Sequence, residues 1–329
     1  LAALEGGVGA LALASGMTAI HYAIQTIAAA GDNIVSTSTL YGGTYNLFAH
    51  TFPQMGVEVR FADYRDPAAF GKLIDARTKA VFCESIGNPL GNVTDLAALA
   101  QVAHAHGVPL IVDNTVPSPF LCNPIRFGAD IVVHSATKYL GGHGTTMGGV
   151  VVESGKFPWD NGKFPGMTEP SKGYHGVRFY ETFGDFGFTM KARMEIARTL
   201  GPTLAPMSAW MLLQGIETLP VRMDRHCQNT QRIAEYLEQH PAVAWVNYPG
   251  LASSPYNALA RRYMPRGAGG ILSFGIKARA DQPKGQPAGA ADAPAAQRAG
   301  ERFIDTVRRI GLPPFKAAAD AQRHLTASH

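Results

Sequence analysis

The sequence is poor in cysteine. Its three cysteines, Cys83, Cys122 and Cys227, are scattered through 329 residues and form no Cys-x-x-Cys pair. Isolated cysteines favour a reducing compartment over a disulfide framework, and they offer no zinc-binding pattern. We therefore expect a cytoplasmic protein without a metal site.

Clustered charge and long apolar runs are also missing. The 29 basic and 25 acidic residues give a net charge of +4, and no basic cluster with interleaved aromatic residues occurs. A nucleic-acid partner is therefore not expected. The most apolar stretch, Val8 to Ile20, contains Ser15 and Thr18 and has no basic leader. It is neither a membrane span nor a signal peptide by these criteria.

The remaining pattern alternates between strand and helix periods. With 46% hydrophobic residues the chain can form a large core. We expect strands over 33–38, 57–61, 78–83, 110–112, 130–134 and 149–152, and helices over 15–30, 44–52, 66–73 and 95–106. This order predicts an α/β fold with a mainly parallel sheet between helices.

The C-terminal third differs in pattern. Helices dominate from 189 to 240, and strands over 243–247 and 270–276 begin a smaller, incomplete α/β domain. We divide the chain into a large domain over 1–225 and a partial small domain over 226–329. Residues 281–300, rich in Ala, Pro, Gly and Gln, read as a poorly packed insertion before a helix over 301–309.

An amine and a carboxylate end two of the predicted strands. Asp113 ends the apolar run 109–112, and Lys138 follows the run 130–134. In a parallel sheet both lie at the C-terminal edge, where α/β proteins bind ligands. A lysine there is either a solvated cation or an amine ready to form a Schiff base. Pyridoxal phosphate (PLP) needs such a pair, an amine for its aldehyde and a carboxylate for its ring nitrogen.

Residues that suit a phosphate lie nearby in the pattern. Ser135 and Thr137 flank Lys138 and can offer hydroxyl hydrogen bonds. The segment Ser15-Gly16-Met17-Thr18 opens a helical run, and free N–H groups at a helix start suit a phosphate dianion.

Several motifs together resemble the Cys/Met-metabolism group of PLP enzymes. They are Ser135-Ala136-Thr137-Lys138-Tyr139, Val112-Asp113-Asn114-Thr115, Ser15-Gly16-Met17 and Tyr41-Gly42-Gly43-Thr44-Tyr45. Within that group, the insert over 157–175 and the continuation Arg178-Phe179-Tyr180 look most like O-acetylhomoserine sulfhydrylases. The resemblance implies fold type I, the aspartate-aminotransferase-like fold of PLP-dependent transferases, and a homotetramer built from dimers with shared active sites.

The resemblance also implies roles for single residues. Tyr41 would stack on the pyridine ring and exchange protons with the incoming amine, and Asn88 would lie beside the cofactor's phenolic oxygen. Asp113 would pair with the ring nitrogen, and Lys138 would be both covalent anchor and general base. Gly16, Met17, Ser135 and Thr137 would hold the phosphate.

The implied reaction is a γ-replacement. O-Acetyl-L-homoserine would lose acetate and take up sulfide or methanethiol, giving homocysteine or methionine. Cystathionine γ-synthase and methionine γ-lyase are the nearest rivals. The long insert over 157–175 disfavours the γ-synthase. The γ-lyase is disfavoured because it commonly has a cysteine at the position of Gly43. The preferred acyl donor and thiol are left open.

Rival readings of other classes remain. The pattern of residues 1–7 predicts the last turn of a helix. In the family that the chain resembles, the segment before this helix end reaches the cofactor phosphate of a neighbouring subunit. Residues 311–329 lack the family's motif for the substrate carboxylate. A catalytically impaired remnant that binds cofactor or assembles with partners is therefore an alternative. Gly7 to Ala12 matches a dinucleotide pattern, but no strand is predicted before it, so a nicotinamide enzyme is disfavoured.

Overall fold

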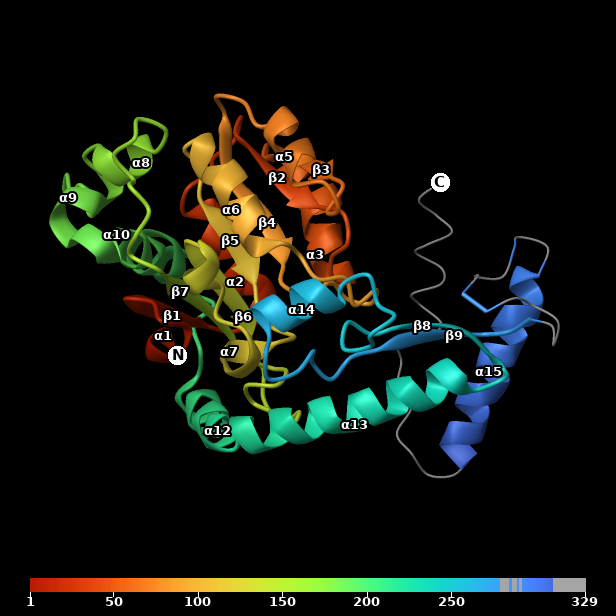
Figure 1. The fold of residues 1–329 in the computed structure, drawn as a ribbon. Coiled ribbons are helices and arrows are strands. Elements are labelled where there is room, and N and C mark those ends of the chain that lie inside the picture. The colour runs from red at the N-terminus through yellow and green to blue at the C-terminus, as the bar shows by residue number, and fades with distance from the viewer. Residues whose placement is uncertain (279–283, 286–288, 290–291, 310–329) are drawn as a thin grey trace.

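A computed structural model of the protein describes residues 1–278, 284–285, 289 and 292–309. Figure 1 shows a large sheet with helices on both faces. The long helix α13, Leu219–Gln239, runs from this body toward a small second sheet and α15, Ala293–Arg309. The domain boundary proposed at residue 225 lies within α13, so one continuous helix joins the two parts.

The large sheet has seven strands. Their order across the sheet is β1-β7-β6-β5-β4-β2-β3. The bounds are β1 Gly9–Leu13, β2 Asn33–Thr37, β3 Glu58–Ala62, β4 Thr78–Glu84, β5 Leu110–Asp113, β6 Ile131–Ser135 and β7 Gly149–Glu153. Strands β2 to β6 pair in parallel, and β7 is antiparallel to both β1 and β6. The predicted mainly parallel sheet between helices is therefore confirmed.

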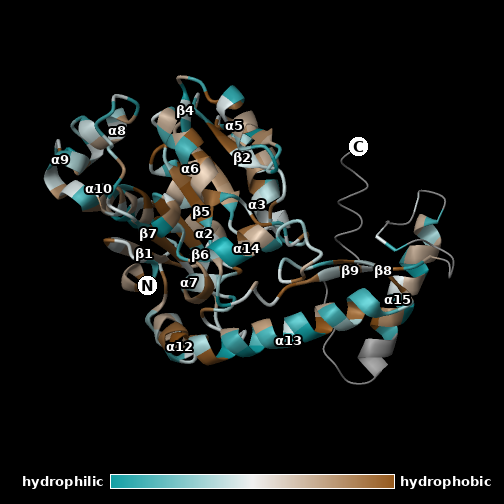
Figure 2. Ribbon diagram, in the orientation of Figure 1, coloured by the Kyte–Doolittle hydropathy of each residue, from teal (hydrophilic) through white to brown (hydrophobic). Residues whose placement is uncertain are grey.

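The buried strands are apolar on both faces because each face is covered by helices. In β5 the side chains alternate between two cores: Val112 packs in one with α6, Leu96–Ala105, and Ile111 packs in the other with α2, Gly16–Gln25. The same period-two alternation places residues of neighbouring parallel strands on a common face. Figure 2 shows the resulting hydrophobic colouring of the central strands.

Short helices and turns connect the strands. The remaining helices of the large body are α1 Ala2–Glu5, α3 Gly42–Asn46, α4 Phe52–Gln54, α5 Pro67–Leu73, α7 Ser118–Leu121, α8 Pro165–Thr168, α9 Phe179–Phe183, α10 Gly187–Lys191, α11 Arg198–Leu200 and α12 Pro206–Glu217. Side-chain caps fix three helix starts: Ser15 for α2, Asp66 for α5 and Asp95 for α6. No described helix has the length and apolar character that crossing a membrane would require.

The C-terminal part contains the predicted pair of strands. Strand β8, Val243–Asn247, pairs antiparallel with β9, Ser273–Ile276. Helix α14, Asn257–Tyr263, lies against the large body, and its Tyr263 hydroxyl donates a hydrogen bond to the Asp95 carboxylate.

Three expectations from the sequence were wrong. Strand β1 was not predicted, and the helix expected over 15–30 ends at Gln25, before the turn at 31–32. Helix α15 begins at Ala293, inside the insertion predicted over 281–300, because its alanine-rich sequence favours helix. Residues 279–283, 286–288, 290–291 and the tail over 311–329 lie outside the described residues.

Candidate active site

The C-terminal ends of three adjacent parallel strands form the centre of the site. Strand β4 ends at Glu84, which pairs in register with Asp113 at the end of β5. Asp113 in turn pairs with Val133 of β6. Lys138 follows β6 in a turn closed by its own N–H, which donates to the Ser135 carbonyl at 3.1 Å. Its side chain is exposed, and the ammonium makes no hydrogen bond or ion pair with any residue that the structure describes.

Asp113 is fixed from one side only. Its Oδ1 accepts hydrogen bonds from the N–H of Thr115 at 2.9 Å and from the Thr115 hydroxyl. The N–H of Ser135 donates to the same hydroxyl at 2.8 Å, so Thr115 joins the ends of β5 and β6. Burial raises the pKa of Asp113, and the Thr115 hydrogen bonds and the charge of His134 oppose that rise. Within the described residues Oδ2 has no bonded partner.

The start of helix α2 packs directly against the C-terminal end of β6 and the first residue of β7. A Cβ on Gly16 would lie 2.5 Å from the Cβ of Ser135, and one on Gly149 would lie 1.9 Å from the Ser15 carbonyl oxygen. Both distances are impossible for a real side chain, so glycine is required at each position. The first amides of α2, which have no partner within the helix, are thereby held beside Ser135.

The hydroxyl of Thr137 is already hydrogen-bonded to the main chain of Gly148. It donates to the Gly148 carbonyl at 3.2 Å and accepts the Gly148 N–H at 3.1 Å. Of the four residues predicted to hold the phosphate, Gly16, Met17 and Ser135 lie around the helix start, and Thr137 is engaged with the main chain.

Tyr41 and Asn88 come from two different loops that meet at Glu84. The Tyr41 N–H donates to Glu84 Oε1 at 2.6 Å, and the Asn88 N–H donates to Glu84 Oε2 at 3.2 Å. A Cβ on Gly43 would lie 2.7 Å from the ring of Tyr41 and 3.2 Å from the Met17 sulfur. The Tyr41 ring therefore lies close to the start of α2.

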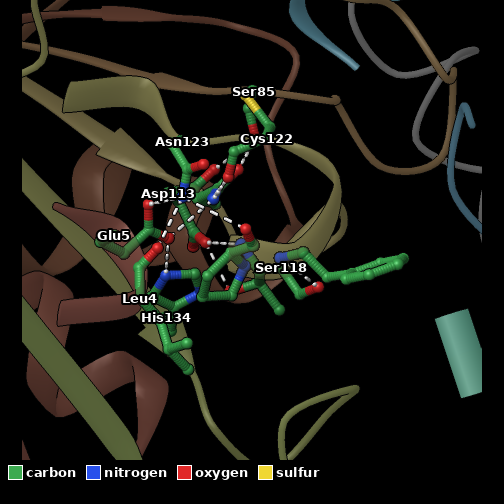
Figure 3. Close-up of polar contacts among 12 residues, drawn as sticks. Leu4, Glu5, Ser85, Asp113, Ser118, Cys122, Asn123 and His134 are labelled. Atoms are coloured by element: carbon green, nitrogen blue, oxygen red, sulfur yellow. Dashed lines mark hydrogen bonds and ion pairs between the residues drawn. The ribbon is translucent and has the colours of Figure 1, made fainter. Parts of the chain in front are cut away.

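A second polar cluster lies on the opposite face of the sheet, directly behind Asp113 (Figure 3). Glu5 of α1 and His134 of β6 are buried, with 2.6 Å between Glu5 Oε1 and His134 Nε2. Asn114 donates from Nδ2 to Glu5 Oε1 at 2.9 Å and accepts a hydrogen bond from the Ser85 hydroxyl at 2.9 Å. The Asn114 side chain, next to Asp113, is thus fixed by Glu5 and Ser85 from two other segments.

No role was expected for Glu84, Thr115 or the Glu5–His134 pair. For Glu84 a signal was present: an acid directly after an apolar strand, in the position that Asp113 has on the next strand. For Glu5 there was none, because its partner is 129 positions away in the chain.

Comparison with known proteins agrees with the motifs. The profile of the family described as Cys/Met metabolism PLP-dependent enzyme matches residues 1–287. An O-acetyl-L-homoserine sulfhydrylase of Leptospira meyeri is 50% identical over 293 residues, which cover 86% of this chain and 66% of the relative. A homocysteine/cysteine synthase of Saccharomyces cerevisiae is 51% identical over 280 residues, covering 84% and 63%. The chain thus spans about two thirds of the length of these relatives.

Solved structures show the same fold. A putative O-acetylhomoserine (thiol)-lyase from Campylobacter jejuni superposes with a TM-score of 0.81 at 39% identity, covering 84% of this chain and 69% of that one. That protein carries N'-pyridoxyl-lysine-5'-monophosphate. An O-acetylhomoserine sulfhydrylase of Wolinella succinogenes gives a TM-score of 0.78 at 40% identity, covering 92% and 79%. The predicted PLP-dependent, type I fold is confirmed.

The residues at the strand edge fit PLP. Asp113 has a partly buried carboxylate with one oxygen open to a further donor, as a protonated ring nitrogen requires. Lys138 presents an unpaired ammonium three residues beyond the end of β6. Between α2 and Ser135, the space that a side chain at position 16 would need is absent, so position 16 can offer only its main-chain amide to a phosphate there.

Proposed function

Because this chain belongs to the Cys/Met metabolism PLP-dependent enzyme family, we propose that it is a transferase that replaces the γ-substituent of O-acetyl-L-homoserine. Sulfide or methanethiol is the nucleophile, and the products are homocysteine or methionine and acetate. The observation that carries the proposal is the placement of Lys138 and Asp113 at one edge of one sheet. The names of the relatives support acetylhomoserine as the substrate.

In this proposal the chain's own groups bind and orient the cofactor. When bound, PLP supplies an aldehyde and a pyridine ring that accepts carbanion charge. Asp113 Oδ2 holds the proton on the ring nitrogen, while Thr115 fixes Oδ1. Tyr41 would stack on the ring, and Asn88 would lie beside its phenolic oxygen. The amides of Gly16 and Met17 bind the phosphate.

Two further hydroxyls are assigned to the phosphate. Ser135 lies against the start of α2 and can donate directly. Thr137 contributes by exchanging its hydrogen bond to the Gly148 carbonyl for one to a phosphate oxygen. Both hydroxyls are partly buried, where a charge-assisted hydrogen bond is stronger than in water.

Lys138 moves the protons. Its amine would hold the cofactor before substrate arrives, and the released Nζ would take the proton from the substrate's Cα. A second proton leaves Cβ, the Cγ–O bond to acetate breaks, and a Cγ–S bond forms with sulfide. The removed protons return to Cβ and Cα, so the net change exchanges acetate for the thiol. The exposed position of Lys138 leaves its amine free to swing between these carbons.

Assembly and compartment complete the proposal. Met207, Trp210 and Leu213 are about 60% exposed on one side of α12, and apolar side chains at this spacing suit an interface with a second copy. We propose a homo-oligomer, which light scattering after size exclusion tests. The three thiols are free and buried, which supports a reducing, cytoplasmic location.

Product analysis tests the function. The PLP-loaded chain is incubated with O-acetylhomoserine and either sulfide, methanethiol or cysteine, and homocysteine, methionine, cystathionine and acetate are quantified. We expect homocysteine with sulfide, equal acetate, and no turnover by Lys138→Ala, with Lys156→Ala, an exposed lysine after β7, as control.

Other outcomes select the rivals. Cystathionine as the main product would select the γ-synthase activity, and methanethiol released from methionine would select the lyase. Cofactor absorbance without any product would show a remnant that binds PLP but lacks the activity.

A further inference from the structure

The Glu84 side chain connects two loops, which the Asn92 amide also joins by donating to the Thr39 hydroxyl at 3.2 Å. The loop after β2 covers residues 38–41 and ends with Tyr41, and the loop after β4 contains Asn88. Each loop offers one main-chain N–H, and these reach different oxygens of the Glu84 carboxylate, at 2.6 and 3.2 Å. The side chain is buried, with 5% of its surface exposed, so water does not compete for these donors.

These two contacts require two acceptor oxygens on one side chain. Both partners are N–H donors, and both Glu84 oxygens accept. A glutamine of the same shape has one oxygen and one NH₂ group, so one loop would face a donor in place of an acceptor. Since a buried donor without an acceptor is unfavourable, that loop would move.

The position of Glu84 in the sheet links it to the proposed cofactor site. It pairs in register with Asp113, so both carboxylates project from the same face at the ends of neighbouring strands. The loops that it holds carry the side chains assigned to stack on the ring and to flank its phenolic oxygen. Gly43 leaves the Tyr41 ring against Met17 at the start of α2. The placement of Tyr41 thus depends on the Glu84 side chain, which accepts its main-chain N–H, and on Gly43, which leaves room for its ring.

We propose that Glu84 is a positioning residue that sets the placement of Tyr41 and Asn88 around the cofactor ring. The inference rests on the proposed function for its catalytic consequence. The connection between the two loops is a property of the protein alone and can be measured without cofactor.

The test compares Glu84→Gln with Glu153→Gln. Glu153 is a matched control because it is also a buried glutamate at a strand end whose carboxylate accepts two main-chain N–H groups, from Phe188 at 3.1 Å and Thr189 at 2.7 Å. It lies at the opposite end of the sheet from the Lys138 turn, since β7 runs antiparallel to β6. Amide hydrogen exchange is measured by mass spectrometry on both cofactor-free variants.

In Glu84→Gln we expect exchange to accelerate about tenfold or more in peptides covering residues 38–44 or 85–91, because at least one N–H loses its acceptor. The PLP-loaded variant should show a displaced visible absorption maximum and a kcat about 10- to 100-fold below wild type, since reacting groups misplaced by about 1 Å slow catalysis to that degree. The KM for O-acetylhomoserine should change less than kcat. Glu153→Gln should leave all four properties at wild-type values.

The proposal is overturned if Glu84→Gln matches Glu153→Gln in loop exchange, absorption maximum and kcat. If Glu84→Gln does not fold, Glu84→Asp replaces it; its side chain is one methylene shorter and cannot reach both donors, so the same changes are expected. Unchanged exchange in that variant would equally refute the inference. If the wild-type chain binds no PLP, the proposed function fails while loop exchange still decides the role of Glu84.

Discussion

The buried pair of Glu5 and His134 leads to a large and specific stability effect. Glu5 has no exposed surface, its Oε1 lies 2.6 Å from His134 Nε2, and it also accepts a hydrogen bond from Asn114. Replacing Glu5 by alanine leaves His134 Nε2 buried without this partner and leaves Asn114 Nδ2 with only the Cys122 carbonyl, at 2.9 Å. Breaking a buried pair from one side costs roughly 3–5 kcal/mol, so we expect Glu5→Ala to lower the free energy of unfolding by about that amount.

Urea unfolding followed by the fluorescence of buried Trp159 measures this change. Glu58→Ala is the control: its carboxylate also pairs with a basic side chain, Arg60 at 2.9 Å, but the Glu58 side chain is 56% exposed. Exposed pairs contribute only about 0.2–1 kcal/mol. The double variant Glu5→Ala/His134→Ala should be less destabilised than the sum of the single variants. The reasoning is refuted if Glu5→Ala costs no more than Glu58→Ala, or if the two buried substitutions add.

Two further predictions concern the sheet edges. Burial raises the pKa of Glu153 to about 7 from 4.5, so the folded state binds a proton between these values that the unfolded chain releases. The resulting stabilisation is present below pH 4.5 and is lost as pH rises toward 7, by roughly 3 kcal/mol. The free energy of unfolding of Glu153→Gln, measured with urea, should therefore rise relative to that of wild type from pH 5 to 8. If the difference between the two free energies does not change with pH across this range, the account is contradicted. Gly149→Ala should weaken PLP binding at least about tenfold, because its Cβ would force the Ser15 carbonyl and the start of α2 away. PLP binding is measured by fluorescence titration. In this assay Gly173→Ala, whose Cβ would meet open space, should bind PLP as wild type does.

The parts of the fold that follow from local pattern were predicted from the sequence. Strands β2 to β7 are short runs bounded by turns, and their expected bounds differ from the observed ones by one residue at most. Strand β1, Gly-Ala-Leu-Ala-Leu, has no β-branched residue, so its strand conformation comes from pairing with β7 across the sheet. Tertiary pairing of this kind leaves no mark in the local sequence.

The candidate site could likewise be predicted only where it follows from local pattern. Lys138 and Asp113 could be placed together because parallel strands bring their C-terminal ends to one edge. The partners of these residues could not, because their contacts join distant segments: Glu84 holds Tyr41 from 43 positions away, and Glu5 meets His134 across 129. Whether a strand-end acid is solvated or holds a loop depends on burial, which a single sequence does not specify.

The central claim is that Lys138 and Asp113 hold one cofactor ring between them. Borohydride reduction of the PLP-loaded protein, followed by peptide mass mapping, tests it most directly. The account predicts a pyridoxyl group on Lys138 in the wild type and none in Lys138→Ala. In Asp113→Asn the adduct should stay on Lys138 while the cofactor's affinity falls by about tenfold or more, since the ring nitrogen loses its charged partner. A pyridoxyl group on any other lysine of the wild-type protein, or none at all, would contradict the account.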